Sequence, residues 1–179
     1  MKIKQTQLLD DLISMTKTHI KRAEELLKLN ETQLNYKKDE NSWSILECIE
    51  HLNRYGDFYI PEITAKLSGS SNSSNTYFKS GVLGNYFAKS MMPKEKLNKM
   101  KTFNTMNPNN SSLNFSVLDK FILQLNEMLD ILEKSKTTDI QKIKTSISIS
   151  KLIKLRLGDT LRVVIYHNER HLQQAEKIN

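Results

Sequence analysis

The stretch LRLGDTLRVVIYHNERHLQQAEKI, residues 155–178, predicts a long amphipathic helix that carries two of the chain's four histidines. His167 and His171 are four residues apart, and residues at that spacing lie on one face of an α-helix. Val164 and Ala175 share this face, so both imidazoles are expected to point toward the core. Two imidazoles in this arrangement are able to share one metal ion.

A second motif, SWSILECIEHLNRYGDFY at residues 42–59, predicts the start of another helix. Ser44 and Glu47 have the spacing of a capping box, in which each side chain bonds the backbone N–H of the other residue. Apolar residues then recur on one face of the helix. His51 lies beside this face, so its imidazole should also point inward.

Four segments carry apolar residues at spacings of three and four, which predicts four long helices. They cover residues 6–29, 44–67, 115–134 and 159–177. We therefore expect an all-α fold, a four-helix bundle with a long crossover connection, in a single domain over residues 1–179. No substantial sheet is expected.

The segments between these helices are less regular. Residues 30–41 read as a polar connector and residues 68–76 as a polar loop. The stretch 77–112 is expected to be mostly irregular with one short helix, and a connection of this length often covers a functional site. In residues 136–157 the letters TSISIS alternate as in a strand, yet a lone short strand has no evident partner.

Charge and composition exclude several classes of protein. The net charge of +7 comes from 27 basic and 20 acidic residues, and only five of the basic residues are arginine. The lysines are scattered, with small clusters in 94–101 and 142–154, and nucleic-acid recognition usually needs Arg, so no nucleic-acid partner is expected. The lone cysteine excludes an intramolecular disulfide, and there is neither a signal peptide nor a membrane-spanning apolar run. A cytoplasmic protein is expected.

His51 turns a weak two-histidine pattern into a candidate site for a divalent metal. Three imidazoles in one small core are costly without an ion, although His51 could instead be a satisfied core histidine. Cys48, one turn before His51, is a possible fourth ligand but reads more simply as a small buried apolar residue, against which Trp43 should pack. His19 lies beside the apolar stripe of the first helix and is not expected to be a ligand. Residues expected on the helix surface or at an interface are Tyr166, Glu169 and Arg170.

The two motifs together resemble the DinB-like (YfiT-like) superfamily. Residues 42–59 match its Trp-Ser, Glu and His-Leu pattern, and residues 155–178 match its Leu-Gly-Asp entry with two histidines four apart. The resemblance extends over essentially the whole chain. It implies a bundle in which His51, His167 and His171 bind a divalent metal, nickel or zinc in different members. It also implies a homodimer, since several members form one.

Characterised members of the family include S-transferases that use low-molecular-weight thiols such as bacillithiol or mycothiol, and a maleylpyruvate isomerase. The resemblance therefore favours a metal-dependent thiol S-transferase acting on a small-molecule substrate held under residues 77–112. A metal-dependent hydrolase is the nearer enzymatic alternative. The competing class is a non-catalytic, stress-related bundle that binds a metal or ligand. In each case the imidazoles must be neutral to bind an ion, so affinity is expected to weaken as the pH falls through about 6.5.

Overall fold

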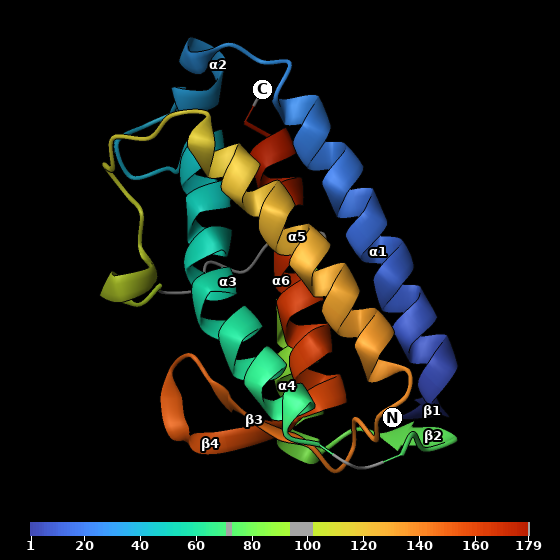
Figure 1. The fold of residues 1–179 in the computed structure, drawn as a ribbon. Helices are drawn as coiled ribbons and strands as arrows, with labels where there is room; N and C mark the ends of the chain where they lie inside the picture. The colour runs from blue at the N-terminus through green and yellow to red at the C-terminus, as the bar shows by residue number, and fades with distance from the viewer. Residues whose placement is uncertain (71–72, 94–101, 179) are drawn as a thin grey trace.

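Four long helices lie side by side in the computed structural model and form the bundle that the sequence predicts (Figure 1). They are α1 (Gln5–Leu26), α3 (Ile45–Ser68), α5 (Ser116–Ser135) and α6 (Leu157–Glu176). α1 packs against α5 and α6, and α3 packs against the same two helices. The structure describes residues 1–70, 73–93 and 102–178. Among these residues, no helix is long and apolar enough to cross a membrane.

Shorter elements occupy the connections between the long helices. They are α2 (Glu31–Asn35), α4 (Val82–Met91), the 3-10 helix η1 (Asn104–Met106), and the strands β1 (Lys2–Lys4), β2 (Tyr77–Lys79), β3 (Lys144–Ile147) and β4 (Ser150–Arg156). α4 is the short helix expected within 77–112, and β2 and η1 are additions to that expectation. The predicted lysine cluster at 94–101 and residues 71–72 of the predicted polar loop lie outside the described residues.

The expectation that the strand-like segment at 145–150 lacks a partner is wrong. β3 pairs antiparallel with β4, which follows it directly, so the partner is the next stretch of chain. Thr145 lies opposite Leu155, and Leu155 is buried against Val163 of α6. The hairpin thus caps the end of the bundle where α6 begins.

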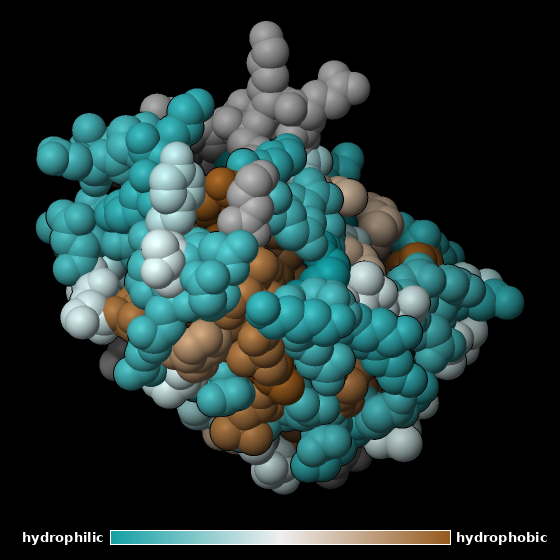
Figure 2. Space-filling model, turned by 90° about the horizontal axis from the view of Figure 1, so that it is seen from above, coloured by the Kyte–Doolittle hydropathy of each residue, from teal (hydrophilic) through white to brown (hydrophobic). Residues whose placement is uncertain are grey.

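Apolar side chains, most of them from the long helices, fill the interior in two large clusters. One cluster includes Leu9, Leu12, Ile63, Phe78, Leu132 and Leu161. The other includes Leu34, Ile49, Leu118, Phe121, Leu125 and Leu172. Seen from the α2 end, hydrophilic side chains cover most of the surface, and hydrophobic ones gather near its middle (Figure 2). Burial of these stripes supplies the main driving force for folding.

The capping box predicted for α3 is present. The Ser44 backbone N–H donates to Glu47 Oε2 at 2.8 Å, and the Glu47 N–H donates to Ser44 Oγ at 3.2 Å. A box of this kind satisfies two backbone donors that the helix cannot. It fixes where α3 begins.

A buried carboxylate joins α4 to α6. Asp159, in the first turn of α6, accepts hydrogen bonds from Ser80 Oγ and from the Gly81 N–H, the latter at 2.8 Å. Arg162, one turn later, donates to Asp159 at 3.2 Å and to Asn85 Oδ1 of α4 at 3.2 Å. Because both charges are buried, each needs the other and these bonds. The network fixes α4 beside α6.

Gly158 allows β2 to approach α6 closely, and Gly158→Ala is expected to destabilise the fold by about 1–3 kcal/mol. A Cβ at this position would lie 2.7 Å from Phe78 Cε2 and 3.0 Å from Ile140 Cδ1. Both neighbours are fully buried and have no room to move. The gain in helix propensity of alanine over glycine, about 1 kcal/mol, is too small to offset this overlap.

Urea unfolding measures the effect, and Gly69→Ala serves as the matched control. A Cβ at Gly69 meets only the Ala65 carbonyl oxygen, at 3.6 Å. Its φ of −87° is one that alanine adopts freely. The control should therefore change stability by less than about 0.5 kcal/mol. Equal midpoints for the two variants would show that the Phe78 contact is not tight.

Candidate metal centre

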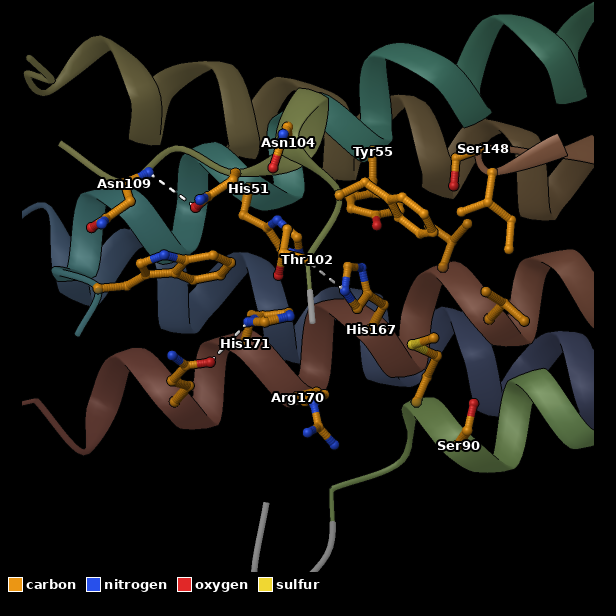
Figure 3. Close-up of a pocket in the computed structure, with 18 of the residues that line it drawn as sticks. His51, Tyr55, Ser90, Thr102, Asn104, Asn109, Ser148, His167, Arg170 and His171 are labelled. Carbon is orange, nitrogen blue, oxygen red and sulfur yellow. Dashed lines mark hydrogen bonds between the residues drawn. The ribbon is translucent and has the colours of Figure 1, made fainter. Parts of the chain in front are cut away.

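The structure brings the three predicted histidines together between α3 and α6. His51 comes from α3, and His167 and His171 come from successive turns of α6 (Figure 3). One ring nitrogen of each lies within 4.8 Å of the other two, and all three side chains are buried. Within the part of the chain that the structure describes, this is the one group of three or more His, Cys, Asp or Glu side chains close enough to share an ion.

Hydrogen bonds outside the cluster orient two of the imidazoles. His51 Nδ1 donates to the Met106 carbonyl at 2.7 Å, and His171 Nδ1 donates to Gln174 Oε1 at 3.0 Å. With the proton held on Nδ1, the Nε2 lone pair of each ring is left for the cluster. His51 Nε2 lies 3.3 Å from His167 Nε2. This arrangement selects the tautomers that a shared ion would need.

Burial keeps the three imidazoles neutral. It lowers the pKa of His51 to about 4 and that of His171 to about 3. The pKa of His167 falls well below its ordinary value, first because of burial and then because of its histidine neighbours. Neutral imidazoles offer ring-nitrogen lone pairs that a cation can accept. The donor set fits a divalent ion that favours nitrogen ligands, as nickel and zinc do.

The other histidine and the cysteine lie apart from the cluster, as the simpler interpretation of each predicts. His19 is fully buried on α1 and donates from Nε2 to Glu169 of α6 at 2.8 Å. Arg22 donates to the same carboxylate at 2.7 Å, so Glu169 is an interface residue between α1 and α6. Cys48 is fully buried, and burial raises the pKa of its thiol to about 12. A neutral thiol of this kind packs as an apolar group.

Of the two positions that the sequence allowed for Arg170, on the helix surface or at an interface, its burial excludes the first. Its side chain is only 6% exposed and lines the cavity beside the histidines. Figure 3 shows it on the same helix as His167 and His171, with its guanidinium directed away from the three imidazoles. Its positive charge adds to the lowering of the pKa of both neighbouring histidines.

Two aromatic residues flank the cluster, and sequence reasoning gave neither this role. The Trp43 ring centroid lies 4.7 Å from that of His51 and 5.7 Å from that of His171. On the other side, the Tyr55 ring lies 4.6 Å from the His167 ring. Trp43 also packs against the apolar cluster that contains Cys48, as the predicted staple requires. Sequence spacing could have placed Tyr55 beside the cluster, because Tyr55 follows His51 by one helical turn.

A cavity of about 1130 Å³ adjoins the cluster. Its walls come from α3, α6, α4, the β3–β4 turn, the connector before α3 and residues 102–109. The last of these is held over α3 by Arg54, which donates to the Asn107 carbonyl at 2.9 Å, beside the bond from His51 to Met106. The described part of the long connection thus covers the site, as expected.

Comparisons with known proteins agree with this fold. A sequence model of the DinB superfamily matches residues 15–175. Among solved structures, YfiT from Bacillus subtilis, described as a probable metal-dependent hydrolase with an unusual four-helix bundle topology, is similar with a TM-score of 0.58. The match covers 95% of this chain and 85% of that chain at 11% identity, so it shows the fold alone. No curated protein matches the chain by sequence.

Proposed function

Since the chain belongs to the DinB superfamily, we propose that it is a metal-dependent enzyme that acts on a small molecule in the cavity beside the histidine cluster. Its metal ligands are His51, His167 and His171. The proposed reaction is transfer of a low-molecular-weight thiol to an electrophile. Nickel or zinc is the proposed ion, since both accept imidazole ligands readily.

One observation carries the proposal: three neutral imidazoles converge at the wall of a wide cavity. Structural metal sites are closed by four protein ligands, whereas catalytic sites keep a position open. The described residues supply three ligand atoms and about 1130 Å³ of adjoining space. That volume accommodates two small reactants. The non-catalytic alternative would be favoured by a filled or closed site.

The surrounding residues suit a thiolate. A divalent ion, when bound, supplies Lewis acidity that lowers the pKa of a coordinated thiol. The Arg170 charge next to the cluster also favours an anion there. Trp43 and Tyr55 press against the imidazoles from opposite sides and keep water from much of the cluster. In S-transfer, the sulfur would bond to the electrophilic carbon as the bond from that carbon to its leaving group breaks. The leaving group departs with the electron pair of that bond, and the proton lost from the thiol passes to solvent.

Hydrolysis is the second candidate, because YfiT is described as a probable metal-dependent hydrolase. Hydrolysis of an amide or ester usually needs a group that carries a proton to the leaving atom, often a carboxylate. Among the described residues that line the cavity, the carboxylate is Asp39. It accepts from the Asn41 N–H at 3.0 Å within its own turn. The scarcity of carboxylates favours thiol transfer.

Protein stripped of metal and then loaded with nickel or zinc should form thioethers from an added thiol and electrophile faster than the metal-free protein does. Cysteine and bacillithiol serve as thiols, monobromobimane as electrophile, and a panel of esters and amides tests hydrolysis. His167→Ala should lose the rate. His19→Gln, a histidine change outside the cluster, should keep it. Metal-loaded protein that accelerates neither reaction would contradict an enzymatic role and leave the non-catalytic alternative.

A further inference from the structure

We propose that the cavity binds an elongated substrate, or two substrates end to end. The bound molecules have an apolar arm on one side of the histidine cluster and a polar arm on the other. The apolar arm lies toward the β3–β4 hairpin and α4, and the polar arm lies toward the connector before α3. This inference rests on the proposed function and specifies the class of substrate. The reacting atoms would lie where the two arms meet, at the histidines.

The order of residues along the cavity sets the two directions. α3 and α6 run antiparallel (Figure 1), so the ring contacts progress in steps along both helices. Trp43 lies on one side of His51, and Tyr55 lies on the other. Beyond Tyr55, the Tyr59 ring follows at 6.4 Å and reaches the hairpin. Tyr59 follows His51 by eight positions along the helix, which corresponds to a rise of about 12 Å.

The hairpin end of the cavity is apolar. Its wall is a cluster of side chains from α4, the hairpin and α6, namely Phe87, Met91, Ile147, Leu155 and Val163. The polar atoms there bond within the wall. Tyr59 accepts from the Ser148 N–H at 3.3 Å, and Ser90 Oγ donates to the Phe87 carbonyl at 2.7 Å. A ligand here finds apolar surface and few unused hydrogen-bonding groups.

The connector end has the opposite character. Lys38 and Asp39 come from the connector and Lys177 from the end of α6, and all three are exposed. Apart from Arg170, which is level with the histidines, the charged residues among the described lining are these three. Two cations outnumber one carboxylate, so this end favours a neutral or anionic polar group.

Straight-chain alkyl hydroxamates, from acetohydroxamate to octanohydroxamate, test the inference on the zinc-loaded protein. The hydroxamate group binds zinc, and the alkyl chain reports on the apolar end. Trp43 is the chain's single tryptophan and touches the cluster, so its fluorescence reports binding. We expect the Kd to fall by about threefold to fourfold with each added CH₂ across the whole series, because even the longest chain is shorter than the roughly 12 Å between His51 and Tyr59.

Met91→Asp should remove this dependence on chain length, because it places a charge at the apolar end. Val82→Asp is the matched control: it lies on the same helix, and its side chain is 94% exposed. It should retain the wild-type dependence. A zinc-dependent Kd that is the same for all chain lengths would overturn the inference but not the proposed function. Absence of zinc-dependent binding by every hydroxamate would overturn both.

Discussion

His171→Ala is expected to lower the affinity of the protein for zinc or nickel by about 100-fold or more. Loss of a group that merely orients a ligand often costs 10-fold to 100-fold in affinity, and loss of a ligand itself should cost at least as much. Only His51 and His167 would remain within reach of the ion, and no Cys, Asp or Glu among the described residues lies close enough to replace the lost nitrogen. The metal content per chain should fall from near one to near zero after dialysis against a weak chelator.

Competition with a coloured chelator gives the affinities of the wild type and of the three single alanine variants. His19→Gln is the control, since His19 pairs with Glu169 and lies outside the cluster. The metal-free variants should still unfold cooperatively, because the apolar clusters of the bundle are untouched. The metal assignment fails if the wild type binds no divalent ion when one is supplied, or if all three alanine variants retain it.

Metal-free protein should lose about 4 kcal/mol of stability between pH 7.5 and pH 5.5. In the unfolded chain each cluster histidine titrates near 6.5, whereas burial lowers the pKa of His51 to about 4 and that of His171 to about 3 in the fold. Between these values the unfolded chain binds more protons, so stability falls as the pH falls. One pH unit below 6.5 this costs about 1.4 kcal/mol for each histidine.

Chemical denaturation at a series of pH values from 7.5 to 5 measures this loss. His171→Gln removes one titrating group and should reduce the loss by about a third. The pKa of Glu169 is lowered to about 2, chiefly by its bond to His19, so its contribution disappears only as the pH falls from 4.5 toward 2. That window lies below the one measured. A stability that does not change down to pH 5 would mean that the imidazoles are accessible to water.

The lowered pKa values also revise the expected pH dependence of metal binding. From the ordinary pKa of histidine, protons were expected to compete with the ion below about 6.5. In the folded protein, direct competition at His51 instead begins near its pKa of about 4. Acid should therefore release the ion mainly by unfolding the protein. Metal loss and unfolding should then share one midpoint.

The spacing of apolar residues was sufficient to predict the long helices, because each helix buries one stripe of apolar side chains. It placed His167 and His171 on one face for the same reason, and it added His51 because that residue lies beside the apolar face of its own helix. It missed the hairpin because the partner strand, β4, was assigned to an unclear segment and no glycine or asparagine marks the turn. The expected homodimer and cytoplasmic location stay predictions.

Side-chain roles that depend on distant parts of the chain were beyond periodicity. Arg170 is one residue from His171, yet its burial and its place in the cavity wall follow only from the folded chain. Trp43 and Tyr55 read as ordinary apolar positions until α6 is placed opposite α3. The Met106 carbonyl could not have been chosen at all, since every residue carries one.

Residues 105–107 are held over α3 through their backbone carbonyl oxygens. Arg54 donates to the carbonyls of Thr105 and Asn107, and His51 donates to that of Met106 between them. Substitutions at these three positions leave all the acceptors in place, whereas deleting one residue moves the next carbonyl by about 3.8 Å. Related or engineered chains are therefore free to vary the amino-acid sequence of this segment but not its length.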